Sequence, residues 1–149
     1  MIFGKKKETS KNEYPKEPVC YCFLGKDEDR VKVLNGNPKF EMSTKELIEA
    51  GYSGRAVYRY YPEYKYDIAL LPEPTNKNDP NAVMILIKGQ FFGYVNRDDA
   101  PAIKKALESD IIDKVSLKVS GGSVRRIFES GQSTADRYDL EFKLRIEYK

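Results

Sequence analysis

Aromatic and cationic side chains are concentrated in one short stretch, a mixture typical of single-strand nucleic-acid binding. Bases stack on aromatic rings while cations meet phosphates. Residues 55–66 interleave tyrosines with cations: Tyr58, Tyr60, Tyr61, Tyr64 and Tyr66 with Arg55, Arg59 and Lys65. The alternative is that tyrosine is a favoured strand residue, and that half of these rings pack into a sheet. We expect one or two of the tyrosines to contact a ligand.

A second group of candidates surrounds the stretch PEPTNKNDPN, residues 72–81, in which proline, asparagine and aspartate are turn formers. Asp79 could accept a hydrogen bond from a terminal 3′-hydroxyl, and its charge would repel a phosphate there. Such a carboxylate would select a strand end over an internal position. The alternative is that Asn76 and Asp79 only brace the turn through side-chain to backbone bonds. Tyr94 and Arg97 end the strand that returns after this loop, and Arg97 is the expected phosphate ligand.

The chain offers little for catalysis. It has no histidine, and Cys20 and Cys22 are its only cysteines. This excludes a four-ligand zinc site within one chain and any histidine-based chemistry, so we expect two thiols that pack. Residues 141–143, EFK, resemble the E-x-K of metal-dependent nucleases, but strand alternation puts them on a solvated face without an obvious aspartate partner. We expect no enzyme activity and no metal or other cofactor.

The distribution of charge limits the mode of binding. The net charge is +3, and residues 1–16 alone hold five lysines and two glutamates. That leaves 21 of the 26 basic and 21 of the 23 acidic side chains for residues 17–149. Coating of a duplex by charge alone is therefore not expected, although a local basic patch is left open. No apolar run could cross a membrane, and no signal-peptide core follows the first lysines, so we expect a cytoplasmic protein.

The residues around the loop follow a recurrent order: Glu73-Pro74, Asn76, Asp79, Asn81-Ala82-Val83, Gly93-Tyr94-Val95 and Arg97. This order resembles the HIRAN domain, a small module fused to DNA-remodelling helicases and also found as free-standing bacterial proteins. The family pattern is an apolar strand, E/D-P-x-N-x-x-D-x-N-A-V/I, a strand, and then G-Y/H-hydrophobic-x-K/R. The resemblance is close over residues 68–97 and loose over about 55–148.

The resemblance implies DNA binding without catalysis. In a HIRAN domain of the helicase class, an Arg-Tyr-Tyr triplet helps to hold the 3′ end of a DNA strand, and Arg59-Tyr60-Tyr61 reproduces it. The family often has Pro-Tyr where this chain has Lys77-Asn78, so a stacking aromatic is lost. The sequence has no phosphate loop and no helicase motor, so remodelling activity is not implied.

Hydrophobic patterning predicts the elements that position these residues. Strands are expected at 19–24 and 30–34 as a hairpin, then at 68–71, 82–88, 91–95, 115–119, 124–128 and 140–148. Residues 43–46, STKE, fit a capping box for a short helix that ends at Gly51, and a second helix follows Asp98 or Asp99 as its cap. Gly121-Gly122 is expected to turn the chain, and residues 129–137 to form a polar loop.

These patterns predict a mostly β protein, an OB-like or SH3-like barrel with two short α-helices. We expect a flexible basic tail (1–16), an accessory β-hairpin (17–40) and a HIRAN-like barrel domain (41–149). The predicted function is recognition of single-stranded DNA, preferably at 3′ ends, in DNA repair or replication. Arg59 and Arg97 would contact phosphate, and Tyr60 or Tyr61 would stack on bases. The alternative is a protein-interaction module on the same scaffold.

Overall fold

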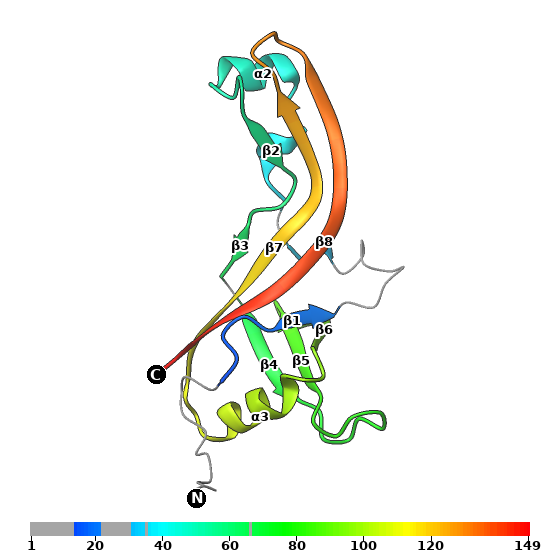
Figure 1. Cartoon of the computed structure of the whole chain (residues 1–149), viewed down its shortest axis with the longest axis vertical. Helices are drawn as coiled ribbons and strands as arrows, with labels where there is room; N and C mark the ends of the chain where they lie inside the picture. Colours follow the sequence, from blue (N-terminus) through cyan, green and yellow to red (C-terminus); the bar gives the residue numbers. More distant parts are fainter. Residues whose placement is uncertain (1–13, 22–30, 35, 66) are drawn as a thin grey trace, which may run out of the picture.

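The fold is built mainly of antiparallel β-structure. The computed structural model describes residues 14–21, 31–34, 36–65 and 67–149 (Figure 1). Its strands are β1 (Val19–Tyr21), β2 (Ala56–Tyr58), β3 (Glu63–Tyr64), β4 (Ile68–Pro72), β5 (Val83–Ile87), β6 (Gln90–Val95), β7 (Ile112–Ile127) and β8 (Ser133–Tyr148). The helices are the 3-10 helix η2 (Pro38–Glu41) and the α-helices α2 (Thr44–Glu49) and α3 (Ala100–Glu108). Within the described residues, the prediction of a mostly β fold with two short α-helices is confirmed.

One sheet joins the strands in the order β2-β7-β8-β1-β6-β5-β4, and β3 pairs with β7 as well. Within the described residues the first and last strands of this order, β2 and β4, do not pair with each other. The sheet therefore stays open, where the sequence predicted a barrel. Strands β7 and β8 are 16 residues long, and β2 pairs with the far end of β7 while β4 lies at the opposite end of the sheet order.

The long β7–β8 hairpin forms an arm that projects from the main body and carries β2 and α2 at its far end (Figure 1). The expected turn at Gly121-Gly122 is wrong, because β7 continues through both glycines and the chain turns between Ile127 and Ser133. The glycines instead accommodate a shift of register, with φ near +81° at each. A Cβ on Gly121 would lie 1.9 Å from the Asp139 carbonyl oxygen, so glycine is required for close backbone approach there.

Among the described residues, the N-terminal segment contributes strand β1 to the main sheet. Strand β1 lies between β6 and β8, where Cys20 is opposite both Val95 and Phe142. Residues 31–34 form a turn closed by the Leu34 amide on the Val31 carbonyl at 2.9 Å. The predicted hairpin is therefore wrong in the described part of the chain, since Val31 and Leu34 enter the core from a turn. Residues 22–24 and 30 of that prediction, and Cys22 with them, lie outside the described residues.

The last three residues of the predicted flexible tail, 14–16, are held against the body. Residues 1–13 lie outside the described part of the chain, but Tyr14 is only 6% exposed and the next residues dock on β8. The amides of Leu144 and Ile146 donate to the carbonyls of Pro18 and Lys16 at 2.9 and 2.8 Å. Backbone pairing with β8 therefore fixes residues 14–18 to the body.

Two hydrophobic clusters support the two halves of the molecule. The larger one, the main cluster, joins residues of β1, β5, β6, β7, β8 and α3. Strand β8 contributes Phe142, Leu144 and Ile146 to it. The residues between them on β8 face outward, which confirms the predicted alternation. The smaller cluster lies at the far end of the arm and consists of Leu47, Val57 and Ile127, with Phe40, Met42 and Tyr52 packed against it.

The helices follow their local signals. Ser43 caps α2 through a capping box with Glu46, as predicted, and the hydrogen bonds from Ser43 lower the pKa of that carboxyl. Asp99 precedes α3 without a side-chain cap bond to the helix, whereas Ile103 and Ala106 are buried as expected. Among the described residues there is no helix of the length and hydrophobicity needed to cross a membrane.

Candidate nucleic-acid interface

The loop between β4 and β5, residues 73–82, is shaped by its own side chains. Oδ1 of Asn76 accepts hydrogen bonds from the amides of Asn78 at 2.8 Å and Asp79 at 3.0 Å. Oδ1 of Asp79 accepts from the Asn81 amide at 2.9 Å. These are the turn-bracing bonds that the sequence offered as the alternative to ligand binding, so both residues have a structural role.

Glu73 connects this loop to β6. The Tyr94 hydroxyl donates to Oε1 of Glu73 at 2.9 Å, and Nδ2 of Asn76 donates to the same oxygen at 2.7 Å. Sequence reasoning placed Glu73 in the family pattern but did not count it among the site residues. The Glu-Pro dipeptide at the start of the loop was the signal that could have identified it.

Arg97 closes the loop from the other side. Its Nη2 donates to the Asn78 carbonyl at 2.5 Å, and its Nε lies 3.6 Å from Oδ2 of Asp79. The Arg97 side chain is 72% exposed, while that of Asp79 is 20% exposed. The arrangement places an accessible cation beside a partly shielded carboxylate at the surface of the loop.

The structure thus brings together four of the predicted site residues, Asn76, Asp79, Tyr94 and Arg97, but places the Arg-Tyr-Tyr triplet elsewhere. The triplet links β2 to β3 in the upper half of the molecule, whereas the β4–β5 loop lies at its lower end, beside α3 (Figure 1). The amide of Arg59 donates to the Ser123 carbonyl at 2.9 Å, and its own carbonyl accepts from Asn37 at 2.7 Å. These two bonds tie the triplet to the arm.

The rings of the triplet have different surroundings. Tyr60 is partly buried against the main cluster, with the guanidinium of Arg59 5.7 Å from its ring centroid. Tyr61 is 45% exposed. Tyr64 also packs against the main cluster, and Tyr66 lies outside the described residues. The packing of Tyr60 and Tyr64 agrees with the alternative that some of these tyrosines pack into the sheet, and Tyr61 is the exposed tyrosine of the triplet.

The arm carries an aromatic and cationic group of which the sequence analysis singled out only Tyr58. Tyr58 is 44% and Tyr138 is 51% exposed, and both interact with Arg126, whose pKa is raised chiefly by a hydrogen bond to Tyr138. Arg126 also lies 3.8 Å from Asp136. Tyr138 was missed because it adjoins the stretch expected to be a polar loop.

Arg125 contributes to the packing of the arm. Its guanidinium donates to the carbonyls of Phe40, at 2.8 Å, and Met42, and to the Thr44 hydroxyl at 3.2 Å. The side chain thereby ties η2 and the start of α2 to β7. It is a structural cation.

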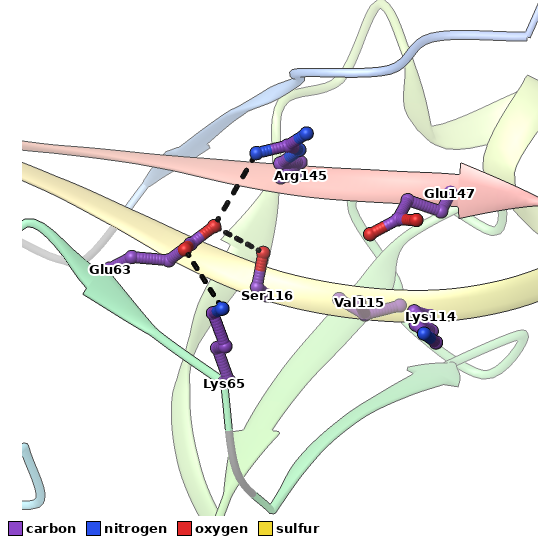
Figure 2. Close-up of a pocket in the computed structure, with 7 residues that line it drawn as sticks. All are labelled: Glu63, Lys65, Lys114, Val115, Ser116, Arg145 and Glu147. Atoms are coloured by element: carbon purple, nitrogen blue, oxygen red, sulfur yellow. Dashed lines mark hydrogen bonds and ion pairs between the residues drawn. The ribbon is translucent and has the colours of Figure 1, made fainter.

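A second surface missed from the sequence lies on the solvent side of β3, β7 and β8. We call it the outer face and define it by Glu63, Lys65, Lys114, Ser116, Lys118, Lys143, Arg145 and Glu147. It contains a pocket of about 490 Å³, and Figure 2 shows the carboxylate of Glu63 between Arg145 and Lys65. The signal was the charge alternation along residues 141–147, but the residues opposite them could not be known without the register of β7.

No family model, curated protein or solved structure matches this chain. Among the residues that the structure describes, no group of three or more His, Cys, Asp or Glu side chains is placed to hold a metal ion. The function must therefore be argued from the geometry of the loop, the triplet and the outer face.

Proposed function

We propose that this protein is a non-catalytic binding module for single-stranded DNA with a preference for 3′ ends. The proposed scaffold is a HIRAN-like barrel of the OB or SH3 type. The antiparallel pairings of β3 with β7 and of β4 with β5 support it, since small barrels are built from such pairs, although the described sheet stays open. The resemblance to HIRAN domains supports a context of DNA repair or replication, and the cytoplasmic location expected from the sequence is part of the same proposal.

The arrangement of Asp79 and Arg97 carries this proposal. A carboxylate only accepts hydrogen bonds and has about four acceptor positions, and the Asn81 amide takes one of those of Asp79. A terminal nucleotide has a 3′-hydroxyl that can donate to Asp79 and a phosphate that can meet the exposed guanidinium of Arg97. An internal nucleotide would instead place its 3′-phosphate against Asp79, which the carboxylate would repel.

The triplet supplies a second contact further along the strand. Tyr61 is the exposed ring and stacks on a base, while Arg59 meets a phosphate beside it. Tyr60 packs against the core, so its contribution is to hold its neighbours in place. Separation of the triplet from the loop requires a ligand of several nucleotides, because one terminal nucleotide cannot touch both.

The test is fluorescence anisotropy of short single-stranded DNA that carries either a 3′-hydroxyl or a 3′-phosphate. We expect the hydroxyl end to bind about tenfold more tightly or better, since one charge-assisted hydrogen bond contributes roughly 1.5–3 kcal/mol. Asp79→Asn should abolish this preference, because asparagine keeps an acceptor for the Asn81 amide but loses the charge.

Asp113→Asn is the matched control, since Asp113 is exposed on β7 away from the loop and the same charge is lost. It should leave the preference unchanged. Equal binding of both ends by the unmodified protein would overturn end recognition. Absence of binding to either DNA at low salt would overturn the DNA proposal itself.

The second candidate function is a protein-interaction module. Strand β4 is the last in the sheet order and, in the described part of the chain, pairs only with β5, while its Leu71 is 46% exposed. An edge of this kind can accept an extended peptide as an additional strand. Salt separates the two functions, because DNA binding weakens steeply with salt and an apolar peptide contact does not.

A further inference from the structure

The pocket on the outer face holds a carboxylate in a set of donors suited to a phosphate. Oε2 of Glu63 accepts from the Ser116 hydroxyl at 3.2 Å and lies 3.8 Å from Nη1 of Arg145. Its Oε1 lies 3.6 Å from Nζ of Lys65 (Figure 2). One hydroxyl and two cations around an oxyanion form a site that a phosphate oxygen can use equally well.

Glu63 is held weakly enough to be displaced. Both of its ion pairs are longer than a charge-assisted hydrogen bond, and the Arg145 and Lys65 side chains are 54% and 65% exposed. Exposed pairs of this kind contribute roughly 0–1 kcal/mol. Strand β3, which carries Glu63, has only two residues, so local opening of this edge is less costly than opening of the core.

The strand register concentrates cations next to this pocket. Arg145 lies opposite Ser116, and two residues further along the ladder Lys143 lies directly opposite Lys118. Like charges that face each other across an antiparallel pair are destabilising. Glu17 offsets Lys118 at 3.2 Å, whereas Lys143 makes no ion pair with any described residue. A negatively charged ligand would relieve this repulsion.

Arg145, Lys118 and Lys143 form a cationic strip, and a carboxylate lies at each end of it. Glu147 lies opposite Lys114 at one end, and Glu141 lies opposite Ser120 at the other. Between them, the positions of Arg145 and Lys143 are about 7 Å apart along β8. That spacing is comparable to the separation of adjacent phosphates in an extended nucleotide chain, so the strip has room for two neighbouring phosphates.

We propose that the outer face binds the sugar-phosphate backbone of single-stranded DNA, with one phosphate displacing Glu63 from Ser116 and Arg145 and the next lying between Lys118 and Lys143. This inference rests on the proposed function and extends its contacts away from the 3′ end. Tyr61, 45% exposed and two residues before Glu63, would stack on a base at the end of this strip. A lipid headgroup fits less well, because the outer face has no exposed aliphatic side chain to enter a bilayer among the described residues.

The experiment uses a covalently closed circle of single-stranded DNA, which has no 3′ end and therefore isolates the outer face from the Asp79 loop. Binding of the full chain is followed by anisotropy across a series of salt concentrations. Lys143→Gln and Arg145→Gln should each weaken binding several-fold and lower the slope of log affinity against log salt by about 1. Lys45→Gln, at an exposed position of α2, is the matched control. It should change neither the log affinity nor the salt slope by more than a few tenths.

Glu63→Gln distinguishes displacement from a general charge effect. Removing the competing carboxylate should strengthen binding to the circle about threefold or more, whereas the same substitution at the exposed Glu49 of α2 should not. Equal gains from both substitutions would overturn the displacement of Glu63. Thermal unfolding of each variant verifies that the fold is retained.

The outcomes separate this inference from the proposed function. If neither Lys143→Gln nor Arg145→Gln weakens binding of the circle, DNA binding by the outer face is overturned. End recognition is not affected by that result. If both substitutions weaken binding of the circle, but linear DNA shows no preference for a 3′-hydroxyl over a 3′-phosphate, the outer face is supported and end recognition is overturned. Binding to anionic vesicles, but not to the circle, with the same dependence on Lys143 would assign the surface to a membrane and overturn the inference.

Discussion

The β4–β5 loop and the outer face differ in how their side chains are held. In the loop, Asn76 and Asp79 direct hydrogen bonds to neighbouring backbone amides, so the loop is shaped locally. On the part of the outer face formed by β7 and β8, the direction of each side chain is set by a strand whose alternate residues are buried, such as Leu117 and Leu144. A functional surface can therefore depend on a few local bonds or on the whole core.

This difference predicts different responses to mutation. Damage to the loop should remain local, because its bonds join residues close in sequence or, among the described residues, reach only Tyr94 of β6, Arg97 and Lys104 of α3. Damage beneath the outer face should affect the whole molecule, because the residues that orient it belong to the main cluster. Three measurements test this comparison.

The largest effect is expected from Leu144→Ala. Leu144 is fully buried and lies between Lys143 and Arg145 on β8, and a Leu-to-Ala change in a core costs about 2–5 kcal/mol. The free energy of unfolding, measured by urea denaturation, should fall by that amount. Lys143→Gln, on the adjacent surface position, should change it by less than about 0.5 kcal/mol. A small loss for Leu144→Ala would contradict core support of the outer face.

A smaller and local effect is expected from Asn76→Ala. This change removes the acceptor for the amides of Asn78 and Asp79 and the donor to Glu73, and unsatisfied polar groups of this kind cost about 1–3 kcal/mol. Hydrogen exchange should accelerate at those two amides and remain unchanged on β7 and β8. Asn78→Ala is the control, since the amide and carbonyl of Asn78 make the hydrogen bonds of this position and remain in place. Faster exchange across the sheet would contradict a locally held loop.

The smallest effect is expected at Tyr148, which helps to hold residues 14–18 against β8. Burial, followed by the charge of Asp99, raises the pKa of Tyr148 to about 12 from 10.0, and its hydroxyl donates to the Pro15 carbonyl. The folded state disfavours the phenolate, so this stabilisation is fully present below pH 10 and is lost as the pH rises toward about 12. Thermal unfolding across this range should show a steeper decline for the unmodified protein than for Tyr148→Phe. Parallel curves would contradict the raised pKa.

The sequence determined the elements that depend on near neighbours. The capping box at Ser43, the turn bonds of Asn76 and the alternation of β8 all follow from short-range spacing, and the structure has each of them. The grouping of Asn76 and Asp79 with Tyr94 and Arg97 could also be predicted, because one β-hairpin, β5–β6, returns the chain to the loop. DNA binding and the likeness to HIRAN domains stay predictions.

Only the tertiary structure decided which distant segments meet. Cys20 pairs with both β6 and β8, residues more than 70 positions away, and no local pattern could choose these strands over a hairpin partner. The glycines of β7 suggest a turn locally, yet long-range pairing with β8 carries the strand through them. For the same reason the triplet lies apart from the loop, and Lys118 lies opposite Lys143. A strand pattern fixes which face a side chain occupies, but the partner strand and its register are set by how the whole core packs.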